Sequence, residues 1–580
     1  MASYSAPVSE IRFVLDDVLD IGRLNALPAF ADVGLDTIHG AIEEAAKLLE
    51  EQLAPLHRSS DQGCTWAYGE VRTPTGYREF YERFQQGGWI GISQSPEYGG
   101  SGFPYVVGKV IEEMTCSANV SFALYPTLTT GCYEAIESCG DEEQHRLYCT
   151  KLATGEWGGT MCLTEPQAGS DVGAIKTRAL PEADGSYRID GNKIFISSGE
   201  HDLTENIIHL VLARLPDAPP GVRGLSTFVV PKFLVNADGT PGERNSVRCV
   251  SIEHKMGLHG SATCSLAFEA AKGWLVGKPG HGIQNMFVMM NFARIGVGIQ
   301  GLGQCELATQ NAIRYARDRK QGKSESGSEL IVDHPDVRRM LLHMKAITEG
   351  ARVLAYETAT YVDIARNHPD PAVREEAQDW VELGTPLTKS FCTDSGFDLA
   401  SMALQVYGGH GYVQEHGIEQ IVRDAKIFCI YEGTNGIQAL DLVRRKLTLR
   451  EGRLPSRFIS AVRGELESSE DFGFIGSPLS TALEALEHAT TEIQKLGLQG
   501  ATDTAFGSAD YLRAFSLTWL GYNWLRMAKA ASKQPQSLMA QAKLATAKYF
   551  ASRVLTSVPS LCANATIPAA SLMALPAEAL

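Results

Sequence analysis

The spacing of hydrophobic residues changes twice along the chain, and this change constrains the fold more than any other feature. Residues 1–157 and the chain beyond 282 carry apolar residues at the spacing of amphipathic helices. Residues 158–277 instead contain short runs rich in Val, Ile and aromatic residues, bounded by Gly, Pro and Asp, which is typical of strands. The sequence therefore predicts a helical region, a compact β-barrel or sandwich, and a second helical region.

Individual segments support this order. Residues 35–58 and 337–366 each place their apolar residues along one side of a helix. Residues 186–199 contain an Asp190-Gly191 pair between two apolar runs, which predicts a tight hairpin. Further short strands are predicted at 206–215, 224–233 and 264–277.

The length of 580 residues suggests about four domains at roughly 150 residues each. A polar, Gly- and Pro-containing interval at 463–478 separates a last helical block from the rest. We therefore expect an α+β multidomain protein with an N-terminal helical domain, a central β domain, a helical bundle and an additional helical domain. The expected boundaries are 1–157, 158–278, 279–446 and 447–580.

Composition excludes several classes of function. The net charge of −16 disfavours binding of the whole surface to nucleic acid or to anionic membranes. The basic cluster at 443–453 is typical of a solvated helix face. The 12 cysteines are scattered without a Cys-x-x-Cys pair, which indicates a reducing, cytoplasmic setting. We expect no secretory signal and no membrane span, because no apolar run reaches about 18 residues.

Two motifs are weak on inspection. "GVGIQG" at 296–301 matches a dinucleotide-binding fingerprint, but helical sequence lies on both sides where a strand should precede it. We expect these glycines to allow close approach of two helices. His254 and His259 lack a carboxylate or cysteine partner at a metal-binding interval, so no metal site is predicted.

The segment "MCLTEPQAGSD" at 161–171 is more informative. A short apolar strand runs into Thr164, Glu165 and Pro166, and a Gly-Ser-Asp turn follows. Such a loop exposes backbone N–H groups and hydroxyls that suit a flat heteroaromatic ring or a pyrophosphate. An ordinary loop at the rim of a barrel remains the alternative.

A single carboxylate stands out in "KIFCIYEGTNGIQALDLVRRK" at 426–446. Glu432 ends an apolar run, and the loop residues Gly433 to Gly436 follow it. By its sequence alone the residue could be a solvated glutamate at the start of a helix.

Four motifs occur in one order: the segment at 161–171, "GGHGY" at 408–412, "RDAKI" at 423–427 and "YEGTNGIQ" at 431–438. Together they resemble the acyl-CoA dehydrogenase family over most of 40–446. The longer N-terminus and the tail resemble an enlarged bacterial branch that includes 3-methylmercaptopropionyl-CoA dehydrogenase and long-chain fatty acyl-CoA dehydrogenases. The resemblance implies a helical N-terminal domain, a β-barrel and a four-helix bundle, with FAD bound between barrel and bundle without a Rossmann strand.

By this resemblance Glu432 is the catalytic base. Oxidation of a saturated acyl-CoA to the 2,3-enoyl-CoA removes an α-proton and a β-hydride, and the hydride goes to flavin N5. The proton requires a base on the opposite face of the substrate. Desolvation beside the apolar run would raise the carboxyl pKa from its ordinary value of about 4.3 and strengthen the base. Gly433 leaves room for the acyl chain.

Further roles follow from the resemblance. Thr164 should bond the isoalloxazine, and Ser170 should also approach the substrate. Phe195 stands where many members have Trp, so ring stacking there is expected to be weaker. Arg294 should lie near Glu432 and the thioester, because an arginine among apolar residues needs an acidic or carbonyl partner. The expected FAD-binding residues are Met161, Leu163, Thr164, Gly169, Ser170, Phe195, Ile196, Ser197, Arg319, Gln321, Gln405, Gly408, Gly409, Thr434 and Asn435.

The family also implies partners. Electrons would pass to an electron-transfer flavoprotein, and FAD would be completed across a subunit boundary, so we expect a homodimer or tetramer. Three alternatives remain: an acyl-CoA oxidase that uses oxygen, a flavin-binding relative without turnover, and a helical interaction protein without cofactor. The sequence leaves open the length, branching and sulfur content of the acyl group, and the role of the tail.

Overall fold

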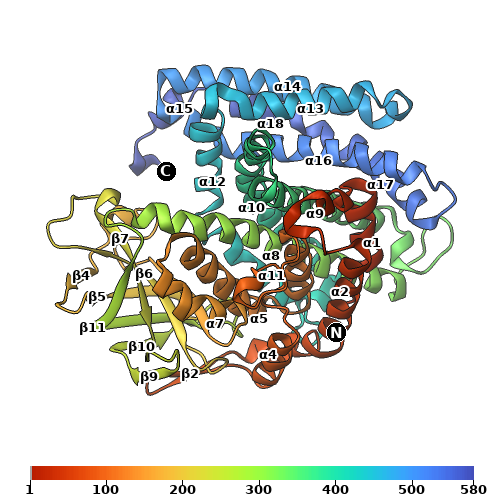
Figure 1. Cartoon of the computed structure of the whole chain (residues 1–580). Coiled ribbons are helices and arrows are strands. Elements are labelled where there is room, and N and C mark those ends of the chain that lie inside the picture. The colour runs from red at the N-terminus through yellow and green to blue at the C-terminus, as the bar shows by residue number, and fades with distance from the viewer. Residues whose placement is uncertain (1–2) are drawn as a thin grey trace. The chain divides into compact units, whose positions relative to one another are not determined.

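The computed structural model describes residues 3–580 (Figure 1). The chain forms two compact units. One, called here the barrel unit, comprises Glu44–Phe103 and Met114–Gly296. The other, called here the bundle unit, comprises the chain up to Glu43, Pro104–Glu113 and Val297–Leu580. The predicted fold class is confirmed: helical sequence precedes and follows a β domain along the chain.

Five strands of the barrel unit close into a ring. Strand β11 pairs with β5 and β7, β5 pairs with β4, and β6 joins β4 to β7. Strands β10 and β3 extend this ring at β11 and β6. A sheet closed in this way leaves few free edges. The bounds are β3 Gly158–Cys162, β4 Arg178–Pro181, β5 Tyr187–Ser197, β6 Ile207–Arg214, β7 Leu225–Pro231, β10 Val247–Ile252 and β11 Thr263–Val276.

The predicted hairpin at Asp190-Gly191 is wrong. Strand β5 runs straight through both residues, since Asp190 pairs with Arg178 of β4 and Gly191 pairs with Phe268 of β11. A Cβ atom on Gly191 would lie 2.3 Å from the Thr177 hydroxyl. The glycine therefore permits a close contact inside the barrel, and pairing on both sides outweighs the local turn preference of Asp-Gly.

Short strands and helices complete the barrel unit. The hairpin of β1 Thr65–Ala67 and β2 Glu70–Arg72 precedes helix α4 Tyr77–Gln86, which ends at Gly87. Strands β8 Phe233–Val235 and β9 Pro241–Arg244 form a second small sheet. Helices α2 Leu35–Leu48, α5 Tyr105–Cys139 and α8 Gly282–Asp318 each begin in one unit and end in the other.

Long helices build the bundle unit: α9 Pro335–Asn367, α10 Pro371–Tyr407, α11 Ile418–Ala425 and α12 Asn435–Asp441 accompany the end of α8. The glycines of "GVGIQG" allow α8 to approach α10, as expected. A Cβ on Gly298 would lie 2.7 Å from the Thr388 side chain, and one on Gly301 would lie 2.5 Å from the Cys392 carbonyl.

The tail forms a further helical layer, drawn in blue in Figure 1. Helices α16 and α17 contact α9. The Trp524 indole donates to the Ala346 carbonyl at 3.0 Å, and the Lys543 ammonium donates to Glu349 at 2.8 Å. The tail is thus packed on α9. Its helices are α13 Arg453–Glu467, α14 Gly473–Gln499, α15 Ala501–Phe506, α16 Ser508–Ser532, α17 Leu538–Arg553, α18 Val558–Ala565 and α19 Ala570–Met573.

Two expectations about this region are wrong. The interval at 463–478 is mostly helical, because α13 and α14 leave only a short break between them. The basic cluster at 443–453 is no simple solvated face: Arg450 and Arg453 both bind the buried carboxylate of Asp379. Among the described residues, no helix is long and apolar enough to cross a membrane.

Candidate active site

The loop predicted to face the flavin leaves β3 at Cys162. Met161 and Thr164 are half-buried, whereas Gly169 and Ser170 are exposed. The Thr164 carbonyl accepts a hydrogen bond from the Ile194 amide at 2.9 Å. The start of the loop is therefore joined to β5, and its tip is open to solvent.

A buried ion pair anchors the same loop. The fully buried Lys193 ammonium donates to the Leu163 carbonyl at 3.0 Å and to the Glu165 carboxylate at 2.9 Å. The amides of Lys176 and Thr177 donate to the same carboxylate at 2.7 and 3.0 Å. Burial alone would raise the pKa of Glu165, but the Lys193 charge and these hydrogen bonds outweigh it and lower the pKa to about 2. Burial lowers the pKa of Lys193, and Glu165 opposes that shift.

Beside this anchor, β5 presents an unusual aromatic residue. Phe195 has a left-handed backbone with φ +58° and is 60% exposed. Its neighbour Ile196 is buried, and Ser197 is half-buried. Such a backbone is costly for a residue that is not glycine, and strained conformations of this kind cluster at functional sites. The exposed ring and the nearby loop fit one side of a flat ring system.

In the bundle unit, Glu432 lies in a turn between two helices. The 3₁₀ turn Lys426–Cys429 precedes it, and α12 begins at Asn435. Glu432 has φ +54° and Gly433 has φ +81°, and both are half-buried. The Thr434 hydroxyl accepts from the Ile437 amide at 3.3 Å and so caps α12.

This turn is bonded to helix α10. The Lys389 ammonium donates to the Gly433 carbonyl and to the Asn435 side-chain oxygen, both at 2.8 Å. The Asn435 amide nitrogen donates to Asp394 at 2.7 Å. The side chain of Asn435, expected to touch FAD, thus makes its hydrogen bonds within the bundle unit, while the Tyr431 hydroxyl donates to the Gln300 side chain.

Arg294 belongs to the barrel unit, near the end of its last helical segment. Its side chain is buried, and the guanidinium carbon lies 6.0 Å from the centre of the Phe287 ring. An arginine in this setting is expected to meet an acidic or carbonyl group. Its approach to Glu432 stays a prediction.

The residues expected to complete FAD across a subunit boundary all lie at helix ends. Arg319 follows α8 and is half-buried, and its guanidinium lies 3.5 Å from the Gln321 side-chain oxygen. Gln405, Gly408 and Gly409 are exposed at the end of α10, where Gly408 ends the helix with φ +60°. Their position leaves them open to contact from a second molecule.

Sequence reasoning missed three residues that hold the predicted site in place: Glu165, Lys193 and Lys389. A signal existed for each lysine. Lys193 falls at an inward position of β5, and Lys389 falls between the apolar residues Leu387 and Phe391 of α10. Buried lysines are rare and need partners, so a lysine in an apolar pattern indicates a specific hydrogen-bonded role.

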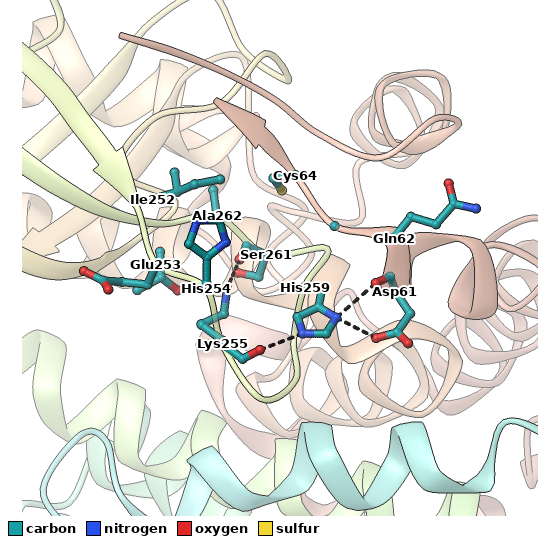
Figure 2. A pocket seen from close by; sticks show the side chains of 12 residues that line it. Asp61, Gln62, Cys64, Ile252, Glu253, His254, Lys255, His259, Ser261 and Ala262 are labelled. Carbon is teal, nitrogen blue, oxygen red and sulfur yellow. Dashed lines mark hydrogen bonds and ion pairs between the residues drawn. The ribbon is translucent and has the colours of Figure 1, made fainter. Parts of the chain in front are cut away.

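A separate polar cavity of about 300 Å³ lies elsewhere in the barrel unit (Figure 2). None of the predicted site residues lines it. His259 Nδ1 lies 2.9 Å from the Asp61 carboxylate, and Nε2 lies 2.7 Å from the Lys255 carbonyl. Both ring nitrogens thus face oxygen atoms of the protein, which is a structural use of this histidine.

The chain matches family models along nearly its whole length. The acyl-CoA dehydrogenase N-terminal domain matches residues 39–156, the middle domain 160–271 and the C-terminal domain 280–447. An acetyl-CoA dehydrogenase C-terminal-like domain matches 458–576. The chain therefore belongs to the acyl-CoA dehydrogenase family.

Individual relatives agree with this assignment. The 3-methylmercaptopropionyl-CoA dehydrogenase of Ruegeria pomeroyi is 42% identical over 95% of this chain and 96% of the relative. A solved acyl-CoA dehydrogenase from Bacillus anthracis, complexed with FAD, has a TM-score of 0.77 at 21% identity, covering 96% of this chain and 91% of that chain. A chain from a solved structure described as the electron transferring flavoprotein of Acidaminococcus fermentans has a TM-score of 0.60 at 29% identity, covering 72% and 100%.

The protein is an FAD-dependent acyl-CoA dehydrogenase, a flavoprotein oxidoreductase of fatty acid metabolism. The exposed aromatic of β5 and the open loop beside it are consistent with a flavin ring, and a half-buried carboxylate is consistent with proton removal from an acyl thioester.

Proposed function

We propose that Glu432 removes the α-proton of a saturated acyl-CoA, so that the product is the 2,3-enoyl-CoA. The observation that carries this proposal is the backbone of Glu432, a non-glycine residue held at φ +54° in a half-buried turn. A left-handed backbone costs about 1–3 kcal/mol and persists where its surroundings enforce it, often at active sites.

Gly433 follows the base with φ +81° and carries no Cβ that would fill the space beside the carboxylate. A positioned carboxylate of this kind typically contributes about 10²–10⁴-fold in rate. The backbone N–H of Glu432 can also donate to the thioester oxygen, where negative charge develops as the α-proton leaves.

When bound, FAD supplies the acceptor for the hydride that leaves the β-carbon. Thr164 and Phe195 would contact the ring from the barrel unit, and Thr434 would contact it from the bundle unit. Ser170 and Arg294 would orient the acyl-CoA. Each of these roles rests on the family motifs together with the exposure of the loop and of Phe195.

The electron acceptor is proposed to be an electron-transfer flavoprotein, because the family resemblance implies one and because a chain from a structure of such a flavoprotein system is similar to this chain. A homodimer or tetramer is proposed from the exposed positions of Gln405, Gly408 and Gly409, which light scattering would test. A cytoplasmic location stays a prediction from the cysteine pattern.

The variant Glu432→Gln tests the base. It keeps the shape of the side chain but removes its ability to accept a proton. We expect normal FAD content and normal binding of a saturated acyl-CoA, with at least a 10²-fold loss in the rate of anaerobic flavin bleaching. The matched control is Glu451→Gln, since Glu451 is an exposed glutamate that also has a left-handed backbone, with φ +59°.

Full bleaching by Glu432→Gln would overturn the base assignment. A panel of straight-chain, branched and thioether acyl-CoA esters, assayed with an artificial acceptor in the absence of oxygen, would define the acyl group, for which the relative from Ruegeria pomeroyi suggests a short thioether acyl chain. Rapid turnover in air with release of peroxide would instead favour the oxidase alternative.

A further inference from the structure

We infer that Lys389 is a positioning residue for Glu432: its buried ammonium group fixes the turn that carries the base. This inference rests on the proposed role of Glu432. Lys389 lies on α10, 44 positions before Gly433 along the chain, and its side chain is fully buried. A buried ammonium group is stable only where hydrogen bonds replace its lost water.

Lys389 bonds to residues on either side of Thr434. One goes to the carbonyl of Gly433, the residue directly after the base, and the other to the side chain of Asn435, the first residue of α12. The Gln438 amide nitrogen lies 3.3 Å from the Glu432 carbonyl and 3.5 Å from the Gly433 carbonyl. Both carbonyls around the glycine are therefore held by side chains.

Asn435 extends this restraint to α10. Its amide nitrogen donates to Asp394 at 2.7 Å and to the Thr393 hydroxyl at 3.0 Å. The Thr393 hydroxyl in turn donates to the Lys389 carbonyl at 2.8 Å. The start of α12 is thus tied to the stretch of α10 from Lys389 to Asp394.

The restraint matters because glycine is the most flexible residue in a chain. Gly433 is the link between Glu432 and the anchored helix, so freedom at this glycine would move the carboxylate. Displacement of a reacting group by about 1 Å can cost about 10²-fold in rate. Lys389 restrains such movement through its bonds to the turn.

The test uses the FAD-loaded protein with Lys389→Met, which keeps the length of the side chain but removes its donors. We expect kcat to fall by about 10²-fold with KM changed by less than about threefold. The control is Lys543→Met in the tail, because Lys543 is also a buried lysine that donates hydrogen bonds, in its case to Glu349 at 2.8 Å. It should lower the thermal midpoint and leave kcat per bound FAD unchanged.

A second measurement isolates proton removal from hydride transfer. A 3-thia acyl-CoA carries sulfur in place of the β-carbon, so it can lose an α-proton but no hydride. In D₂O the base takes this proton and returns a deuteron, and mass spectrometry measures the incorporation. We expect exchange to be slowed about 10²-fold by Lys389→Met and abolished by Glu432→Gln. Asn435→Ala, which removes one acceptor of Lys389, should slow it less.

The outcomes separate the two proposals. If Glu432→Gln still exchanges α-protons, the proposed base is wrong whatever Lys389 does. If Glu432→Gln is inactive while Lys389→Met and Asn435→Ala both exchange at the rate of Lys543→Met, Lys389 has no positioning role. Should Lys389→Met fail to fold, Asn435→Ala alone decides between these results.

Discussion

Each unit contains a fully buried lysine that bonds to a segment carrying predicted site residues, and the two lysines do so differently. Lys193 lies on β5 of the barrel unit, two residues before Phe195, and bonds to the start of the loop at Leu163 and Glu165. Lys389 lies on α10 of the bundle unit and bonds to the residue directly after Glu432. Each unit also has a predicted site residue other than glycine with a left-handed backbone: Phe195 in the barrel unit and Glu432 in the bundle unit.

The two lysines differ in where their hydrogen bonds fall relative to the predicted site residues. In the barrel unit it secures the base of a loop and leaves Gly169 and Ser170 exposed at the tip. In the bundle unit it secures the peptide next to the carboxylate. A loop that closes on a large cofactor can tolerate freedom, whereas a base that must meet one proton cannot.

The largest effect is expected from removing the positive charge of the buried Lys193–Glu165 ion pair in the barrel unit. Lys193→Met leaves the Glu165 carboxylate buried without its cation, so the barrel unit should lose about 3–5 kcal/mol of stability and release FAD. Thermal unfolding and flavin content measure both. The matched control is Arg248→Met, which breaks the exposed pair with Glu269 at 3.0 Å in the same sheet; exposed pairs contribute about 0–1 kcal/mol. Equal losses of stability and flavin in the two variants would contradict a special role for the Lys193–Glu165 pair.

The next prediction is that the stabilities of the two units depend on pH with opposite signs. The pKa of Glu165 is lowered to about 2, so its contribution is present above about pH 4.5 and is lost as the pH falls toward 2. Burial raises the pKa of Asp363 to about 7, although the amides of Tyr105 and Val106 donate to it at 2.6 and 3.0 Å. The folded chain therefore binds this proton more tightly than the unfolded chain, and the bundle unit loses stability as the pH rises from about 4 to 7, by up to about 1.4 kcal/mol per pH unit.

Hydrogen exchange across this pH range, corrected for the intrinsic exchange rate, measures the two regions separately. Peptides from β4 and β5 should gain protection from pH 2 to 4.5. Peptides from the start of α5 should lose protection from pH 4 to 7, and Asp363→Asn should remove most of that slope. An unchanged slope in Asp363→Asn would assign it to another group.

The smallest expected effect is a difference in amide hydrogen exchange between the loop tip at 166–171 and helix α12. Without FAD, amides at the exposed loop tip, 166–171, should exchange quickly, and FAD should slow them by about tenfold or more, which corresponds to about 1.4 kcal/mol. Amides of α12, 435–441, should exchange slowly with or without FAD. Exchange of α12 as fast as that of the loop would show that Lys389 does not restrain it.

Much of the fold was predictable from local patterns. The change between helical and strand spacing located the barrel, and "GVGIQG" was correctly predicted to be a helix contact, because Gly298 and Gly301 meet α10. The errors came where distant partners outweighed local preference. Asp190-Gly191 favours a turn in isolation but pairs with strands on both sides, and Arg450 and Arg453 turned to the distant Asp379.

The amino-acid sequence by itself determined the class of most elements, the family and the identity of the expected base, because periodicity and short motifs depend on neighbouring residues. Tertiary structure alone decided how that base is held. The bonds from Lys193 to Glu165 and from Lys389 to Gly433 join residues 28 and 44 positions apart. Such pairs form only when folding removes water from the lysine and brings its acceptor within reach.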